Sequence, residues 1–323
     1  MASMIDVPAI QVPPFKYDIA MKSGIKKVLM TTWGGIGDQV VAEPTLRYSF
    51  KLFKEYEISL LTSFPELFTH LPFKRVYHKS ESKNINEDEF MVIHTNPPHN
   101  NMARDFVTHH FTQVVDFCSL CAFARQLPIR DREICLVGDE MDLLKRDYVV
   151  IHPGRHWQSK TFPKKWWDEV IQTIVQAHFK VLIVGADTRE ECGTVDVDAT
   201  HCLDLRNKLS LKESTTVLKR ARVVITNDSS PLHIAAAGPA HILLIASCKE
   251  PDHLFHWREG KFGWRMKNLG LDGLWNYLDS CPARTTDFRI DTMPEKLLND
   301  LLPSPASVKE EVINCIYAPG YLE

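Results

Sequence analysis

The sequence predicts an α/β protein of two domains, each built on a parallel β-sheet, with a helix at the C-terminal end. Short apolar runs alternate with helical stretches almost throughout, which is the pattern of βαβ units. The charged stretch DEMDLLKRD at residues 139–147 interrupts this pattern, and a new apolar run begins at Tyr148. A chain of 323 residues is long enough for two domains of about 150 residues, each with a core of its own.

The first domain is assigned to residues 1–146, beginning with an irregular, proline-containing arm over residues 1–24. A Gly-rich turn and a helix through about Leu52 follow the first strand, and residues 104–127 show helical periodicity. Strands are predicted from apolar runs at residues 26–33, 57–63 and 89–95.

The second domain is assigned to residues 147–303, and residues 304–323 form a terminal helix that we expect to pack back on the first domain. The restart of the pattern favours two Rossmann-like domains over one long sheet. Strands are predicted at residues 148–154, 179–185, 222–228 and 241–247, and helices at residues 162–178, 211–221 and 230–238.

The composition argues against several classes of partner. The net charge is −3, and neither half has a run of charges of one sign, which disfavours nucleic acid and acidic membrane surfaces. No apolar stretch is long enough to span a membrane and the N-terminus does not read as a signal peptide, so we expect a cytoplasmic protein, with peripheral membrane contact left open. The eight cysteines lack zinc-site spacing, so no metal is expected.

Three clusters of polar residues and glycines follow predicted strands, where open α/β sheets bind ligands. The first contains Gly34, Gly35, Gly37 and Asp38, between the first strand and the first helix. Glycines let a backbone approach a ligand closely, but the spacing is not the GxGxxG of dinucleotide-binding folds, which disfavours an oxidoreductase. Asp38 suits either a helix cap or a general base that removes a proton from an acceptor hydroxyl.

The second cluster, HPGRHWQSK, follows the strand that begins at Tyr148. A cation in such a loop suits a departing diphosphate, and Lys160 is the candidate; a solvated surface lysine is the alternative. His152, Arg155 and His156 add further hydrogen-bond donors nearby.

The third cluster is VVITNDSSPLHIAAA, residues 223–237. Asp228, Ser229 and Ser230 end a strand and begin a helix, where amides and hydroxyls suit phosphate, although an ordinary helix cap has the same composition. His233 fits either a packed side chain or a phosphate ligand.

Two further carboxylates follow strands of the second domain. Glu190 and Asp204 are possible contacts to the ribose or base of a nucleotide, with surface or capping roles as alternatives. Gly185, where the strand at residues 179–185 stops, completes the predicted donor-binding set.

These clusters, in this order, resemble glycosyltransferase family 9, the lipopolysaccharide heptosyltransferases. The resemblance covers roughly residues 28–302 and lies in GGIGDQVVAEPTLR, VVIHPGRHWQSKTFPKKWWDEVI, LDLRNKLSLKESTTVLKRARVVITNDSSPLHIAAA, and Cys281-Pro282 followed by IDTMPEKLLNDL. It implies a GT-B fold, with two Rossmann-like domains facing each other across a cleft. It also implies an inverting, metal-independent transfer without cofactor, from an ADP- or UDP-linked sugar held by the second domain.

The resemblance also implies residue roles. Asp38 matches the family's catalytic base and Lys160 its lysine near the donor phosphates, while Asp228, Ser229 and His233 match its Asp-Ser/Thr-Gly-x-x-His site. Ser230 stands where the family usually has Gly, so its side chain either narrows the phosphate pocket or adds a hydroxyl to it.

The acceptor remains open between two classes. A glycan such as a lipopolysaccharide core is favoured over a hydroxymethylated DNA base of the phage type, because DNA would need cations along its phosphates. A nucleotide-sugar epimerase and a non-catalytic nucleotide-binding protein are the remaining alternatives.

Overall fold

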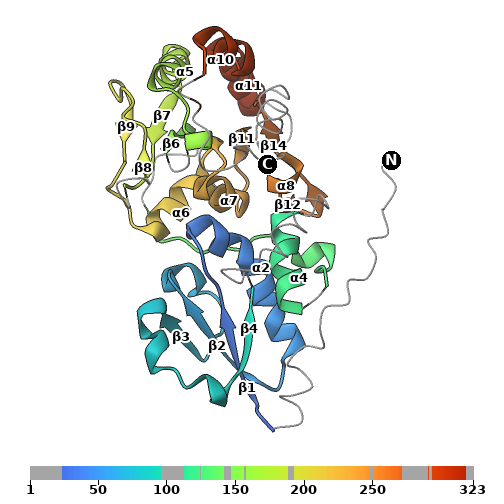
Figure 1. Ribbon diagram of the computed structural model, residues 1–323. Helices are drawn as coiled ribbons and strands as arrows, with labels where there is room; N and C mark the ends of the chain where they lie inside the picture. The colour runs from blue at the N-terminus through green and yellow to red at the C-terminus, as the bar shows by residue number, and fades with distance from the viewer. Residues whose placement is uncertain are drawn as a thin grey trace.

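The two halves of the chain form separate sheets, one above the other in Figure 1. The computed structural model describes residues 24–95, 113–123, 125–141, 147–155, 158–187, 193–247, 251–270, 290 and 293–317. All but the last residue of the predicted N-terminal arm lies outside the described residues. The domain limits at residues 146 and 303 stay predictions.

The first sheet has four parallel strands in the order β3-β2-β1-β4. Its strands are β1 (Lys27–Thr31), β2 (Glu57–Thr62), β3 (Arg75–His78) and β4 (Met91–His94). Two helices pack on it, α2 (Ile36–Leu52) and α4 (Val114–Phe123), and three short 3-10 helices, η1 (Pro65–Phe68), η2 (Lys79–Asn84) and η3 (Glu87–Glu89), lie between strands. The predicted first helix and the three predicted strands of this half are confirmed as α2, β1, β2 and β4. The predicted helix at residues 104–127 is described only from residue 113 onward, where α4 ends at Phe123.

The second sheet has six parallel strands in the order β14-β11-β10-β5-β7-β9. Its strands are β5 (Tyr148–His152), β7 (Lys180–Ile183), β9 (Leu203–Asp204), β10 (Val223–Asn227), β11 (His241–Ile245) and β14 (Met266–Asn268). The helices of this half are α5 (Lys164–Gln176), α6 (Leu211–Arg220), α7 (Ser230–Ala236), α8 (Pro251–Leu254), α10 (Glu295–Leu301) and α11 (Pro305–Tyr317). Its remaining short elements are β6 (Gly154–Arg155), η5 (Gln158–Lys160), β8 (Gly193–Thr194), β12 (Trp257–Arg258) and β13 (Lys261–Phe262), and the short 3-10 helix η4 (Ile129–Asp131) precedes β5.

Counted along the chain, the strands of the second sheet follow the order 3-2-1-4-5-6, which is that of the doubly wound nucleotide-binding fold. The first sheet repeats the first part of this order, 3-2-1-4. The α/β class with parallel sheets, predicted from the alternating pattern, is confirmed.

Alternate residues of the second sheet serve two different cores. Val149 and Ile151 of β5 face α5 and α11, whereas Val150 of β5 and Val224 of β10 face α6 and α7. This alternation across a sheet covered on both faces explains why its strands read as continuous apolar runs.

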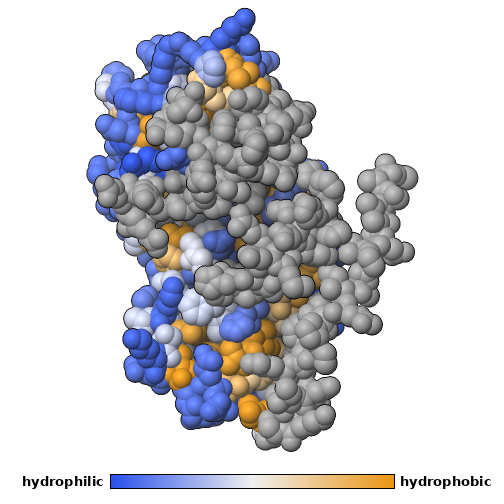
Figure 2. All heavy atoms as spheres, in the orientation of Figure 1, coloured by the Kyte–Doolittle hydropathy of each residue, from blue (hydrophilic) through white to orange (hydrophobic). Residues whose placement is uncertain are grey.

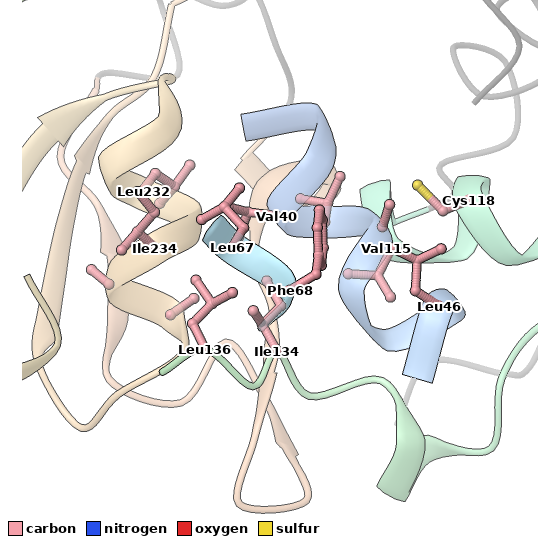
Figure 3. Close-up of a cluster of buried hydrophobic side chains, with 14 of the residues drawn as sticks. Val40, Leu46, Leu67, Phe68, Val115, Cys118, Ile134, Leu136, Leu232 and Ile234 are labelled. Carbon is pink, nitrogen blue, oxygen red and sulfur yellow. The ribbon is translucent and has the colours of Figure 1, made fainter. Parts of the chain in front are cut away.

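The core on the α7 side continues into the first half of the chain. Helix α2 covers the first sheet and α7 covers the second, and these two helices pack against each other (Figure 1). Figure 3 shows Leu232 and Ile234 of α7 beside Val40 of α2 and Leu67 of η1. One apolar cluster therefore spans both sheets and fixes how they face each other.

The segment before β5 is attached to both halves. The backbone amide of Cys135 donates to Glu43 of α2 (2.8 Å), while Thr216 of α6 donates to the carbonyl of Asp139 (2.6 Å). Leu136 is buried in the shared apolar cluster. The residues just before the charged stretch and its first residue, Asp139, thus contact both halves of the chain.

The terminal helix does not pack where the sequence suggested. Val308 and Val312 of α11 are fully buried in the core of the second sheet, next to α5, and both helices lie at the top of Figure 1. The expected return of this helix to the first domain is wrong for α11, because its apolar stripe matches the outer face of the second sheet.

The outer edges of the sheets are polar. Edge strands β3 and β9 lie on the left side of Figure 1, and Figure 2 shows mainly hydrophilic side chains on that side. Charged edges discourage pairing with strands of other chains. Among the described residues, no helix is both long enough and apolar enough to cross a membrane.

We predict that Leu232→Ala, at the α2–α7 contact, lowers the free energy of unfolding by about 2–5 kcal/mol, because Leu232 is fully buried. The control is Leu203→Ala on β9, where the leucine is 46% exposed and the expected loss is within about 0.5 kcal/mol. Urea unfolding followed by circular dichroism measures both, and equal losses would contradict the assigned packing.

Candidate functional site

The three predicted clusters follow the carboxyl ends of β1, β5 and β10. In each sheet the strand order reverses between two adjacent strands, β1 and β4 in the first and β5 and β10 in the second. Chains leaving such a pair turn to opposite sides and leave a crevice that binds ligands. The loops after β1, β5 and β10 contain the first, second and third clusters, respectively.

The loop after β1 is shaped by the contact between Asp38 and its own backbone. The Asp38 carboxylate, in the first turn of α2, accepts a hydrogen bond from the amide of Gly35 at 2.8 Å. Gly34 has a φ of +94°, and a Cβ at this position would lie 2.4 Å from that carboxylate. The capping contact weighed from the sequence is therefore present, and it orients Asp38, which is exposed. Its role as a base stays a prediction.

Gly37 brings this loop against the second half of the chain. A Cβ on Gly37 would lie 3.1 Å from Cδ2 of His233 and 3.5 Å from Cα of Ser230. Both residues belong to α7, so the start of α2 lies close to α7, and a methyl group on Gly37 would fit only if His233 moved by a few tenths of an ångström. The first and third clusters thus face each other across the contact between the two sheets.

Asn227, the last residue of β10, ties the second cluster to the third. Its side-chain amide donates to the carbonyls of Gly154 (2.9 Å) and Lys160 (2.7 Å), and its oxygen accepts from the Ser229 hydroxyl (2.9 Å). The Ser229 hydroxyl also lies 3.1 Å from Nδ1 of His152. These bonds hold the loop after β5 beside the start of α7.

Lys160 and Asp228 form a salt bridge across these two loops, and both side chains are almost fully buried. The sequence assigned both residues to the donor site but did not predict that they pair. A buried ammonium needs such a partner, because removing a charge from water costs several kcal/mol. Lys160 is therefore not a solvated surface lysine.

Two histidines beside this salt bridge are buried. Burial lowers the pKa of His152 to about 4, and burial likewise lowers the pKa of His233 to about 4. Both imidazoles are therefore neutral at neutral pH. His233 also contacts a second buried imidazole, since its Nδ1 lies 2.8 Å from Nε2 of His256.

The remaining predicted donor-site residues are not all brought together. Gly185 has a φ of +146°, and a Cβ there would lie 2.2 Å from Cγ2 of Thr194 and 3.3 Å from Cδ2 of His152. Gly185 therefore packs closely against His152, the last residue of β5. Asp204 accepts hydrogen bonds from Arg206, which lower the pKa of Asp204. Glu190 and His156 lie outside the described residues.

A pocket of about 530 Å³ opens beside the loop after β5. Its lining contains both cations and carboxylates, so its charge is mixed. The lining residues are Arg155, Thr161, Phe162, Pro163, Lys164, Asp187, Thr194, Val195, Asp196 and Arg206.

Three residues of this region were not singled out from the sequence. His94 ends β4, and its Nδ1 lies 2.6 Å from the hydroxyl of Thr31 on β1, at the crevice of the first sheet. The rule that ligand sites lie at strand ends would have found His94 and Asn227. No local signal marks His256, because its partner His233 is 23 residues away.

Within the described ranges, no group of three or more His, Cys, Asp or Glu side chains is placed to hold a metal ion. Metal independence of the whole chain stays a prediction.

Comparison with known proteins bears on the family and the fold. Residues 110–242 match the model of glycosyltransferase family 9 (heptosyltransferase). Lipopolysaccharide heptosyltransferase 2 of Salmonella typhimurium is 22% identical over an alignment of 135 residues that covers 39% of this chain. The match spans 39% of the length of that curated relative.

Solved structures share the fold over most of the chain. The E. coli ADP-heptose lipopolysaccharide heptosyltransferase II superposes with a TM-score of 0.60 at 13% identity, covering 90% of this chain and 98% of that one. The dodecameric, iron-containing glycosyltransferase TibC of enterotoxigenic E. coli gives a TM-score of 0.64 at 14% identity, covering 90% and 76%. The resemblance to family 9 is confirmed over residues 110–242, and the GT-B fold predicted from the sequence is confirmed.

Removing one partner of the Lys160–Asp228 salt bridge leaves the other charge buried without its partner. We therefore predict that Lys160→Met or Asp228→Leu alone lowers the free energy of unfolding by about 3–5 kcal/mol. The double variant should recover most of this loss. The exposed pair Lys164–Asp168 is the control, with an expected coupling below about 1 kcal/mol. Double-mutant cycles from urea unfolding compare the two pairs, and equal couplings would contradict burial of the first.

Stability should fall on acidification from pH 6.5 toward pH 4, because the unfolded chain protonates His152 and His233 near pH 6.5 and the folded chain only near pH 4. The unfolded state then binds more protons, at a cost of about 2 kcal/mol per imidazole at about pH 5. Urea unfolding as a function of pH should give a shallower dependence for His152→Gln and His233→Gln. His78→Gln, at an exposed imidazole, is the control. If the free energy of unfolding varied with pH equally steeply in all three variants, the lowered pKa of His152 and His233 would be refuted.

Proposed function

From the confirmed likeness to glycosyltransferase family 9, we propose that this protein moves a sugar from a nucleotide-sugar donor to a hydroxyl group of an acceptor glycan. The observation that supports this best is the contact between the starts of α2 and α7. Gly37, the residue before Asp38, lies against His233 and Ser230, and His233 belongs to the same half as the Lys160–Asp228 pair. This approach supports a site between the two halves, with Asp38 on one side and Lys160, Asp228 and His233 on the other.

The donor belongs to the second half of the chain. The diphosphate lies against the loops after β5 and β10, where Lys160, the hydroxyls of Ser229 and Ser230, and His233 provide hydrogen-bond donors. The neighbouring pocket of about 530 Å³ has the size to hold a nucleoside. An ADP-linked heptose is the first donor to test, since ADP-heptose is named for the E. coli enzyme of the same fold.

The acceptor belongs to the first half, near Asp38 and the carboxyl ends of β1 and β4. An acceptor oxygen attacks the anomeric carbon while Asp38 takes its proton, the bond from that carbon to the diphosphate oxygen breaks, and the nucleoside diphosphate leaves. Such a single displacement inverts the configuration, and it needs no metal if Lys160 and the hydrogen-bond donors stabilise the leaving charge. A lipopolysaccharide core glycan in the cytoplasm is the acceptor we propose.

A thermal-shift series with ADP, UDP, ADP-heptose and UDP-glucose identifies the donor, because a ligand at about 100 times its Kd stabilises the folded state by about 2.7 kcal/mol. Incubation with and without a lipopolysaccharide core acceptor, in EDTA, then shows transfer by mass. Product formed without acceptor would indicate an epimerase or hydrolase, and binding without turnover a nucleotide-binding protein. Transfer of the sugar to hydroxymethylated DNA would show that the acceptor is a DNA base and not a glycan.

We predict that Asp38→Asn keeps donor binding and loses about 10²–10⁴-fold in turnover, because the amide oxygen can still accept from Gly35 but cannot take a proton. Steady-state kinetics and thermal shift measure the two quantities. Asp88→Asn, at an exposed carboxylate of η3, is the control and leaves both unchanged. Turnover retained by Asp38→Asn would remove Asp38 as the base.

A further inference from the structure

His256 has no role in the function proposed above, yet it is one of the most completely buried polar residues described. It is 1% exposed and lies between α8 and β12, where its backbone amide contacts Sδ of Met266 at 3.3 Å. Its ring stands perpendicular to that of His233, with an interplanar angle of 85° and centroids 5.1 Å apart. The two rings meet through Nε2 of His256 and Nδ1 of His233, 2.8 Å apart.

Two nitrogen atoms at this distance share one proton, so two arrangements are possible for neutral rings. In the first, Nε2–H of His256 donates to Nδ1 of His233, and Nδ1 of His256 keeps only a lone pair. In the second, His233 donates from Nδ1, and Nδ1 of His256 carries a hydrogen. Burial lowers the pKa of both imidazoles, which excludes a shared positive charge at neutral pH.

The surroundings of the outer nitrogen of His256 decide between the two arrangements. Nδ1 of His256 is buried and has no hydrogen-bond partner in the part of the chain that the structure describes. A buried N–H donor without an acceptor is rare and costly, and an unused lone pair is the better tolerated of the two. The first arrangement is therefore the stable one.

We propose that His256 is a positioning residue that donates a hydrogen bond to Nδ1 of His233 and so fixes the proton of His233 on Nε2. The Cδ2–Nε2 edge of His233 faces Gly37, at the contact between α2 and α7. His233 thus presents an N–H donor to the site and has no lone pair there.

This tautomer separates the roles of the two candidate proton-handling residues. An N–H donor beside Lys160 suits an anionic phosphate oxygen, whereas a general base needs a lone pair. His233 consequently binds the donor's diphosphate, and the proton of the acceptor is left to Asp38. The identity of the anion rests on the proposed function, but the tautomer does not.

The test uses the full chain labelled with ¹⁵N-histidine. Long-range ¹H–¹⁵N spectra at neutral pH report which ring nitrogen carries the proton, and the signals of His233 are assigned by their loss in His233→Gln. We expect a protonated Nε2 and an unprotonated Nδ1 in the wild-type chain. A proton on Nδ1 of His233 would overturn the proposal.

Two substitutions of His256 distinguish positioning from packing. His256→Gln keeps an N–H donor near the same place and should retain both the tautomer and the affinity for ADP. His256→Met fills the space without a donor, so we expect the Nδ1–H form of His233 to become populated and ADP to bind about tenfold more weakly. An unchanged tautomer in His256→Met would refute the role of His256. If this variant does not fold, the wild-type spectrum and His256→Gln still decide.

The outcomes separate this inference from the proposed function. His78→Gln, at an exposed histidine, is the control and leaves both readouts unchanged. The expected tautomer together with no binding of any nucleoside diphosphate would overturn the proposed function and leave the positioning role of His256 intact.

Discussion

Helix α2 of the first sheet packs directly on α7 of the second, and the apolar side chains around this contact belong to one continuous core. Two domains of one chain usually meet through a smaller and more polar surface, which lets them move relative to each other. Here Leu232 and Val40 are as deeply buried as residues inside either sheet. Hydrophobic burial therefore sets the distance between the starts of the two helices, and the approach of Gly37 to His233 and Ser230 depends on it.

The strand order explains why that contact is also the site. Both sheets begin with the order 3-2-1-4, so each has a crevice between its first and fourth strands. The segments after β1 and β5 are equivalent in the two halves: the first leads into Asp38 in the first turn of α2, and the second contains Lys160 at the end of η5. The α2–α7 packing brings the first of these loops to α7, and Asn227 brings the second.

Burial explains the salt bridge and the neutral imidazoles of the second half. Lys160 and Asp228 form a salt bridge. Burial lowers the pKa of His152, His233 and His256, so these imidazoles stay neutral at neutral pH. Donors held in place inside an apolar surrounding stabilise a developing negative charge more than mobile groups in water would. This preorganisation is consistent with a site that holds a diphosphate as it leaves.

Local periodicity in the sequence predicted most of the elements, because the spacing of apolar residues reports directly on burial within one strand or helix. The main strands end one or two residues before their predicted ends. The edge strands β3, β9 and β14 escaped this pattern, since each is short, at most partly buried, and without an apolar run. The placement of Asp38, Lys160 and Asp228 after strands followed from the same pattern. The tertiary structure alone decided that Lys160 pairs with Asp228, that His256 meets His233, and that α11 packs on the second sheet. Those pairings depend on which helix faces meet in space, and residues far apart in the chain leave no local pattern from which such a meeting can be predicted.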